Sequence, residues 1–452
     1  MRSRRSRLML LLTVLAMVLA ACGGDGGDAT DSTDTTAGES EVTTTTADSG
    51  TDTTEGEPEA EPVTIEWWHI QNNDPGLSLW QAVADEFMEM NPNVTVNITV
   101  QENEAFKAAL QTNLQAGDVP DLFQSWGGGG LREQVDAGLV QDITEPVSSW
   151  EDELQPAARS MMEIDGALYG APFDLGIVGV WYNRTLFEEA GIDAPPATWE
   201  ELLEDVQTLK DAGITPISLA AGDKWPAMFW YAELALRLGG AEVMQAAGVD
   251  QNFDDPAFLQ AGEEIERLIA LEPFQPGFLA TPWDGPDGAA AVLANGDAAM
   301  LLMGHWAPGT IQANGPDLAA SGELGWFPFP ALEGGAGDPT DAFGGGNGFA
   351  VGRDAPPEAI AFLEYISSVE VASRVGSEAN LLPTTVGSED SITDPNLVEV
   401  IEGRGEASYV QLYLDQAYPP EVGAAVNDSI VTVFAGTGGP QDVVDAVNAS
   451  WE

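Results

Sequence analysis

Polar and apolar positions follow two different periods along the chain from residue 63 onward. Residues 63–68 and 94–100 alternate β-branched or aromatic side chains with polar ones, a pattern that predicts two strands. Between them, residues 79–90 place apolar side chains at helical spacing, and this pattern stops at Asn91-Pro92. Strands that alternate with helices in this way are typical of βαβ units, so the sequence predicts a mainly parallel sheet.

The same alternation continues toward the end of the chain. Further strands are predicted at residues 121–125, 177–183, 217–219, 298–303 and 348–351. Further helices are predicted at residues 105–116, 199–212, 228–238, 257–271, 357–366 and 369–377. Thr198 is the predicted N-cap of the helix that begins at residue 199. Residues 63–452, roughly 390 in all, are too many for one small core. We therefore expect an α/β fold of two lobes.

The first 22 residues have a different pattern. Four arginines at positions 2, 4, 5 and 7 precede an apolar run, residues 8–21, which is shorter than the about 20 residues of a transmembrane helix. The run ends Leu-Ala-Ala-Cys-Gly, which is typical of a bacterial lipobox. We therefore expect residues 1–22 to be a lipoprotein signal peptide, with Cys22 lipidated on the extracytoplasmic face of the cell membrane. A buried thiol is the alternative for Cys22.

Residues 23–62 carry neither pattern. They are mostly Gly, Thr, Asp, Glu, Ser and Ala, with no aromatic side chain and with charges of one sign. Such a segment cannot bury enough apolar surface to fold, and its like charges extend it. We expect a disordered acidic tether here, and a docking tail for a partner is the alternative.

The charge balance excludes several kinds of ligand. The chain has 15 basic and 74 acidic residues, and without the four leader arginines the balance is 11 to 74, a formal charge of −63. This field repels nucleic acid and anionic lipid, and the sequence has no Walker-type Gly-Lys-Ser/Thr motif. The chain has only two histidines and one cysteine, so a metal would find mainly oxygen ligands. We therefore expect no cofactor. Two explanations of the acidic composition are left open, adaptation to salt and adaptation to acid.

Several segments in sequence order resemble the family 1 extracellular solute-binding proteins, which serve sugar ABC importers. These segments are residues 63–69, 115–122 (Gln-Ala-Gly-Asp-Val-Pro-Asp-Leu), 171–173, 181–183, 298–306 (ending Gly-His-Trp) and 411–436. The resemblance covers nearly all of residues 63–452. It implies a periplasmic-binding-protein-like (class II) fold, with a hinge and a ligand cleft between two lobes.

The resemblance also implies the lobe boundaries and the function. Lobe 1 is expected from residues 63–172 plus about 330–382, and lobe 2 from residues 173–329 plus about 383–452. The protein is expected to be a monomer that captures a sugar, an oligosaccharide above all, for permease subunits driven by a cytoplasmic ATPase. A polyamine receptor of the same fold is the alternative, because aromatic rings and carboxylates also bind ammonium groups. A glycoside hydrolase needs two placed carboxylates, and no compact catalytic signature is visible.

A sugar site needs flat aromatic rings for the C–H faces and planar polar groups for the hydroxyls. In an open α/β sheet, such groups belong on loops that follow the strands. The candidate ligand-binding residues on these loops, or in the segments of resemblance, are Asn72, Asp74, Trp126, Gly127, Asp174, Trp225, Trp230, His305, Trp306, Gly346, Asn347 and Tyr413. No catalytic and no metal-binding residue is expected.

Structural roles stay open for several of these residues. Asn72 and Asp74 could form an ordinary turn, and Trp126 could be a core residue. The glycine run 127–130 could bring backbone N–H groups close to a ligand. The run 344–348 resembles a ligand-side segment of the family but could equally be a plain turn, and it lacks the basic residue of a phosphate site.

Other candidates have defined alternatives. Of Trp225 and Trp230, one is expected to stack on the sugar and the other to lie in the core. The carboxylate of Asp174, between apolar residues, needs ligand hydroxyls or a local backbone N–H as partners. The resemblance assigns the stacking role to Trp306. His305 is less clear-cut, because a single histidine is more often a structural group than a ligand contact.

Overall fold

The computed structural model describes residues 61–451, which belong to one compact unit of the chain, Ala60–Glu452. The expected signal peptide, with Cys22, and nearly all of the expected tether lie outside the described residues. Among residues 61–451, every helix is too short or too polar to span a membrane.

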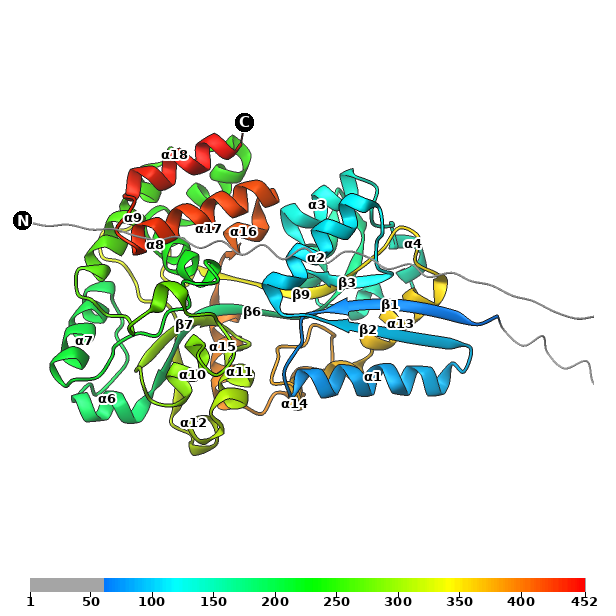
Figure 1. The fold of residues 1–452 in the computed structure, drawn as a ribbon, viewed down its shortest axis with the longest axis horizontal. Coiled ribbons are helices and arrows are strands. Elements are labelled where there is room, and N and C mark those ends of the chain that lie inside the picture. Colours follow the sequence, from blue (N-terminus) through cyan, green and yellow to red (C-terminus); the bar gives the residue numbers. More distant parts are fainter. Residues whose placement is uncertain (1–60, 452) are drawn as a thin grey trace, which may run out of the picture. The chain divides into compact units, whose positions relative to one another are not determined.

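The first part of the sheet has the predicted βαβ form. Strand β1 (Val63–His69) pairs in parallel with β2 (Val94–Val100) and with β3 (Leu122–Ser125). The connecting helices are α1 (Gly76–Met90) and α2 (Asn103–Ala116). These elements and their order are confirmed (Figure 1).

Two long strands then connect the two halves of the sheet. Strand β6 (Gly170–Asn183) pairs antiparallel with β9 (Ala342–Val351) and, further along, with β7 (Met300–Gly304) and β8 (Leu324–Phe327). Strand β9 also pairs with β3, antiparallel, and with β10 (Val410–Leu412), parallel. The expectation of a mainly parallel sheet was therefore wrong. The sheet is mixed because β6 and β9 run through both halves in opposite directions (Figure 1).

Other predicted elements differ in extent. The strand expected at 217–219 is not formed, and Ile217 makes only isolated bridges to Phe274 and Met300. The helix expected at 228–238 is part of α8 (Trp225–Asp250), which is kinked at Gly240, where φ is 71°. The predicted cap of α7 (Trp199–Asp211) is confirmed: Thr198 and Glu201 form a capping box.

The remaining elements cover the two halves of the sheet. The helices are α3 (Gly128–Asp136), α4 (Thr144–Val147), α5 (Pro156–Arg159), α6 (Arg184–Ala190), α9 (Pro256–Ile269), α10 (Ala289–Ala294), α11 (Ala307–Asn314), α12 (Pro316–Ser321), α13 (Pro357–Ile366), α14 (Val369–Ser377), α15 (Pro395–Glu406), α16 (Leu414–Ala417), α17 (Pro420–Phe434) and α18 (Pro440–Ser450). A small hairpin joins β4 (Glu163–Ile164) to β5 (Ala167–Leu168).

Two separate hydrophobic cores divide the described residues into two lobes. The buried residues of the first core lie at 65–173 and 349–381, and those of the second core lie at 177–343 and 382–447. We call the parts around these cores lobe 1 and lobe 2. Their main connections are β6, β9 and the segment at residues 381–383, which is the arrangement expected of a hinge.

Candidate ligand-binding cleft

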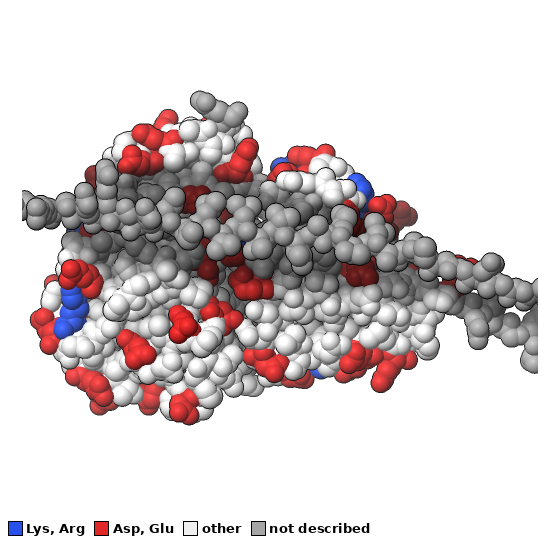
Figure 2. Space-filling view, in the orientation of Figure 1, with Lys and Arg blue, Asp and Glu red and all other residues white. Residues whose placement is uncertain are grey.

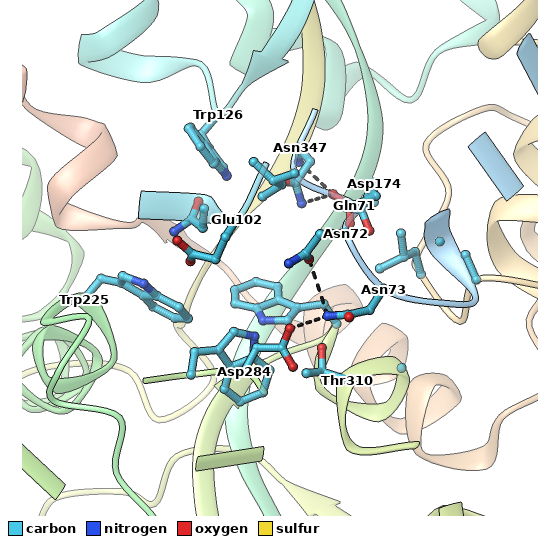
Figure 3. A pocket seen from close by; sticks show the side chains of 18 of the residues that line it. Gln71, Asn72, Asn73, Glu102, Trp126, Asp174, Trp225, Asp284, Thr310 and Asn347 are labelled. Carbon is cyan, nitrogen blue, oxygen red and sulfur yellow. Dashed lines mark hydrogen bonds between the residues drawn. The ribbon is translucent and has the colours of Figure 1, made fainter. Parts of the chain in front are cut away.

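A cleft lies between the two lobes, and most of the predicted site residues border it (Figure 3). Those that do so are Asn72, Asp74, Trp126, Asp174, Trp225, Trp306, Asn347 and Tyr413. The structure thus brings together eight side chains from seven separate places in the sequence. Their contact with a ligand remains a prediction.

The wall of the cleft on lobe 1 is mainly polar. Gln71, Asn72 and Asn73 come from the loop after β1, whereas Glu102 and Asn103 follow β2. Trp126 follows β3, and Figure 3 shows it on the same side as Glu102. Since β1, β2 and β3 are parallel, their carboxyl ends meet at one edge, and this places the amides and carboxylates together.

The wall on lobe 2 is mainly aromatic. The centroid of the Trp225 ring lies 6.2 Å from that of Trp306 and 6.4 Å from that of Trp283. The ring of Phe229 stacks on Tyr413, with centroids 5.4 Å apart and planes inclined by 18°. These rings come from α8, the loop before α10, the residue before α11 and the residue before α16, so four parts of lobe 2 hold the wall in place.

A polar bridge joins the two walls. The side-chain amide of Asn73, on lobe 1, donates to Oδ2 of Asp284, on lobe 2 (Figure 3). The other oxygen of Asp284 accepts from Nδ2 of Asn314 at 2.9 Å. The bridge therefore ends on a carboxylate that lobe 2 holds in a fixed position.

Asp174 has all its partners within the protein. Its side chain is 0% exposed, and Oδ1 accepts from the backbone N and from Nδ2 of Asn347, both at 2.7 Å. Oδ2 lies 3.1 Å from Nε2 of His305, and Gln124 donates to Oδ1 of Asn347 at 2.6 Å. A backbone N–H is therefore a partner of Asp174, but it belongs to Asn347 on the paired strand β9 and is not the local N–H that the sequence suggested. This buried network lies where β6 and β9 cross between the lobes.

Four predicted residues do not border the cleft. Trp230 is 1% exposed and packs on Trp199 and Phe329 in the second core, whereas Trp225 reaches the cleft. His305 is fully buried beside Asp174, behind the cleft wall. Gly127 and Gly346 are the other two, and both lie against backbone atoms of the protein.

The two glycines bring backbones of the protein together. A Cβ at Gly127 would overlap the backbone carbonyl of Met161, and φ there is 72°, which favours glycine. A Cβ at Gly346 would overlap the backbone carbonyl of Asp174 on the paired strand β6. Gly127 thus allows close backbone packing within lobe 1, and Gly346 allows it where β6 and β9 cross.

Other residues border the cleft that were absent from the sequence-based set. They are Gln71, Glu102, Asn103, Lys107, Phe229, Trp283, Asp284, Thr310 and Gln416, with several apolar neighbours. Asn73 and Asp415, which the sequence also suggested as ligand contacts beside Asn72 and Tyr413, border the cleft as well. Glu102 and Asn103 follow a predicted strand and could have been found by the rule that found Asn72. Trp283 and Asp284 lie in the segment Thr-Pro-Trp-Asp-Gly-Pro-Asp-Gly, where an aromatic residue in a turn-rich loop was the available signal.

The cleft is acidic. Next to it, the carboxylate of Asp223 accepts from the backbone N of Trp283, a residue that borders the cleft, at 2.6 Å. Burial raises the pKa of Asp223 to about 6, the Trp283 N–H opposes this, and the negative charges of Glu102 and Glu104 add to the rise. Lys107 is the basic residue that borders the cleft, and its ammonium is 3.1 Å from Glu104 and 5.4 Å from the centre of the Trp126 ring. Residues 61–451 contain no group of three or more acidic, His or Cys side chains placed to hold a metal.

Two α/β lobes joined by long crossing strands, with an aromatic and polar cleft between them, define a two-lobed solute-binding protein. The chain belongs to the bacterial extracellular solute-binding protein family, whose sequence model matches residues 72–373. The family expected from the sequence is thereby confirmed, and its members are binding proteins.

Relatives of known sequence support this assignment. The chain is 25% identical over 283 residues to the multiple sugar-binding protein of Streptococcus mutans, covering 61% of this chain and 64% of that protein. It is 26% identical over 277 residues to an uncharacterized ABC transporter extracellular-binding protein of Pyrococcus horikoshii, covering 59% of each chain. The chain thus spans about three fifths of the length of these curated relatives.

Solved structures show the fold over a longer stretch. A structure from work on xylan utilization by the thermophilic bacterium Caldanaerobius polysaccharolyticus has a TM-score of 0.80 and 26% identity, covering 85% of this chain and 99% of that one. A chitin oligosaccharide binding protein has a TM-score of 0.80 and 24% identity, covering 87% and 98%. The two-lobed α/β fold expected from the sequence is confirmed.

Proposed function

We propose that the protein captures an oligosaccharide in the interlobe cleft and delivers it to the permease of an ABC importer. The observation that carries this proposal is the pairing of an aromatic wall on lobe 2 with a wall of amides and carboxylates on lobe 1. Sugar rings present apolar C–H faces and a rim of hydroxyls, so the two walls match the two surfaces of one ligand. We propose no chemical step, since binding and release are sufficient for this role.

The relatives support the same ligand class. Proteins similar to this chain include multiple sugar-binding and lactose-binding proteins, and a structural relative binds chitin oligosaccharides. We propose that the importer comprises permease subunits with a cytoplasmic ATPase and that the receptor acts as a monomer. We also propose that the lipobox sequence at Cys22 anchors it to the outer face of the membrane, with residues 23–62 as the tether.

The lobe boundaries expected from the sequence are part of the proposal. We propose that residues 63–172 plus about 330–382 form lobe 1, and that 173–329 plus about 383–452 form lobe 2. The two hydrophobic cores support this division except after residue 330, since Ala342 and Phe343 are buried in the core of lobe 2. The cleft then opens and closes about β6, β9 and the segment near residue 382.

Thermal melting against a panel of solutes tests the proposal. The unit Ala60–Glu452 holds all described elements and is melted alone and with mono- and oligosaccharides, polyamines and amino acids. A ligand that binds only the folded state stabilises it by about 2.7 kcal/mol at a hundredfold excess over its Kd. We expect a clear increase in Tm with one group of oligosaccharides.

Matched tryptophan variants connect this increase to the cleft. Trp306→Ala should remove the ligand-dependent increase in Tm, because Trp306 forms part of the aromatic wall. Trp68→Ala is the control, since Trp68 is also partly buried but lies on β1 away from the cleft. If sugars leave Tm unchanged and reducing ends are released from an oligosaccharide, the protein is an enzyme and the proposal is wrong.

A polyamine receptor is the second candidate, and the acidic lining of the cleft favours it. The cleft is bordered by one ammonium, that of Lys107, and by several carboxylates, those of Asp74, Glu102, Asp284 and Asp415 among them. Aromatic rings and carboxylates together suit an alkylammonium chain. An increase in Tm with spermidine and none with any sugar would establish this candidate in place of the first.

A further inference from the structure

The N-terminus of α3 meets lobe 2 backbone to backbone. A Cβ at Gly128 would overlap the carbonyl oxygen of Gln416, and a Cβ at Gly129 would overlap that of Tyr418 and lie 2.8 Å from the N atom of Pro419. The next residue, Gly130, has no atom within 4 Å of the position of its Cβ. We call the contact of Gly128 and Gly129 with residues 416–419 the glycine seam.

The two sides of the glycine seam belong to different lobes. Leu131, on α3, is buried in the first core, whereas Leu414 and Tyr418 are buried in the second. The seam also borders the cleft, because Trp126 precedes it on lobe 1 and Gln416 is part of it on lobe 2. The distance between the two backbones of the glycine seam therefore depends on the separation of the two lobes on this side of the cleft.

We propose that the glycine seam is a closing contact of the two lobes and that Gly129 is a positioning residue for the closed state. The proposal rests on the binding of a solute in the cleft. Gly129 itself is absent from the cleft lining, so it acts only by letting lobe 1 approach lobe 2. A methyl group at this position should hold the lobes apart, because rotation about the connecting strands relieves the overlap while both cores stay intact.

Gly129→Ala and Gly130→Ala form a matched pair that tests this role. Both residues lie in α3, neither has a positive φ, and only the first has an atom of lobe 2 near its Cβ. Residues 60–452 contain no cysteine, so cysteines replacing the exposed Met90 on α1 and Val249 on α8 can carry a fluorescent donor and acceptor. Energy transfer between them then reports the separation of the lobes.

Without ligand, we expect Gly129→Ala to lower the transfer efficiency and Gly130→Ala to match the parent protein. We expect Gly129→Ala to melt within about 3 °C of the parent, since no core is disturbed. An unchanged transfer efficiency would overturn the proposal. A large loss of Tm or a failure to fold would also overturn it, because the overlap would then lie within a rigid body that cannot open.

Binding separates this inference from the proposed function. With the solute found in the melting panel, Gly129→Ala should weaken binding tenfold or more, mainly through faster dissociation, and Gly130→Ala should bind as the parent does. Equal affinity of both variants would contradict the role of the seam and leave the proposed function standing. If the parent protein binds no solute in the panel, the proposed function fails, and the ligand-free energy transfer still decides whether the seam controls the separation of the lobes.

Discussion

Asn73 and Asp284 are the side chains that join the polar and aromatic walls of the cleft. Because Asp284 is also held by Asn314, the bridge adds a hydrogen bond to a fixed carboxylate whenever the lobes approach. Hydrogen bonds to charged groups contribute about 1.5–3 kcal/mol, and less where water competes. We therefore expect this bridge to form when the lobes close and to break when they separate.

Asn73→Ala should weaken ligand binding by roughly three- to tenfold, because the closed form loses the bridge. Asn97→Ala is the matched control, since Asn97 also donates to an exposed carboxylate, that of Glu66 at 2.8 Å, but on β2 away from the cleft. Calorimetric titration of both variants measures the effect. Equal affinities would show that the bridge has no part in closure.

The sequence predicted the residues of the cleft where a local rule applied. Asn72 and Trp126 follow strands, and both border the cleft, because loops at the carboxyl ends of the strands form ligand sites in an open α/β sheet. Trp225 and Trp230 could not be told apart, because which one faces the cleft depends on the packing of α8 against Trp199 and Phe329. Asp284 was missed for a similar reason, since its partner Asn73 is 211 residues away in the chain.

At the level of elements, β6 and β9 carry the connection between the lobes. Their crossing contains the buried network of Asp174, Asn347, His305 and Gln124. These partners leave the carboxylate of Asp174 without an exposed atom. The network therefore fixes the register of the two strands at the hinge.

Asp174→Ala should lower the free energy of unfolding by about 2–4 kcal/mol, because Asn347 and His305 lose their buried acceptor. Urea denaturation measures this loss. Asp165→Asn, which removes an exposed carboxylate beside Arg132, serves as control and should leave the unfolding free energy nearly unchanged. If Asp174→Ala had the stability of the control, the network would not hold the hinge.

Helix α8 provides a test by pH. Burial raises the pKa of Glu233 to about 7, and the neighbouring Arg237, 3.5 Å away, opposes this rise. The folded state thus binds the proton more tightly than the unfolded state, so the stabilisation is complete below the ordinary pKa of about 4.5 and is lost as pH rises toward 7. Tm should fall between pH 5 and pH 8, and Glu233→Gln should reduce that fall. An equal fall in both proteins would contradict this assignment.

The elements could be predicted as far as periodicity carries information. Most of the predicted helices and strands lie where the apolar pattern placed them, and the predicted cap at Thr198 is correct, but several short elements such as α3, α6 and β8 were not predicted. Strand direction could not be read from the pattern, because β6 is buried along all 14 residues and shows no alternation. Residues 217–219 are apolar enough for a strand, but Ile217 meets its neighbours only at isolated bridges.

For the whole molecule, negative charge is the dominant feature of the surface. Figure 2 shows acidic side chains spread over the visible face, with few basic ones. In the described residues, nine of the eleven basic side chains form ion pairs with carboxylates. The other two, Arg184 and Arg404, donate to backbone carbonyls. Most of the acidic charge is therefore uncompensated within the protein.

This excess charge predicts a stability that depends on salt. Raising NaCl from 0.1 to 1 M shortens the screening length from about 10 to about 3 Å, which reduces repulsion between carboxylates. Tm at pH 8 should rise by several degrees, and the rise should be smaller at pH 5, where carboxyls such as Asp223 are partly protonated. A Tm that is independent of salt at pH 8 would contradict the account of the surface.

We propose above all that the interlobe cleft holds an oligosaccharide between an aromatic and a polar wall. A crystal structure of Ala60–Glu452 with the oligosaccharide that raises Tm most tests this directly. We predict sugar rings stacked on at least two of Trp126, Trp225, Trp283 and Trp306, with hydroxyls hydrogen-bonded to side chains that follow β1 and β2. An oligosaccharide bound outside the cleft, or a cleft that stays empty at saturating ligand, would contradict it.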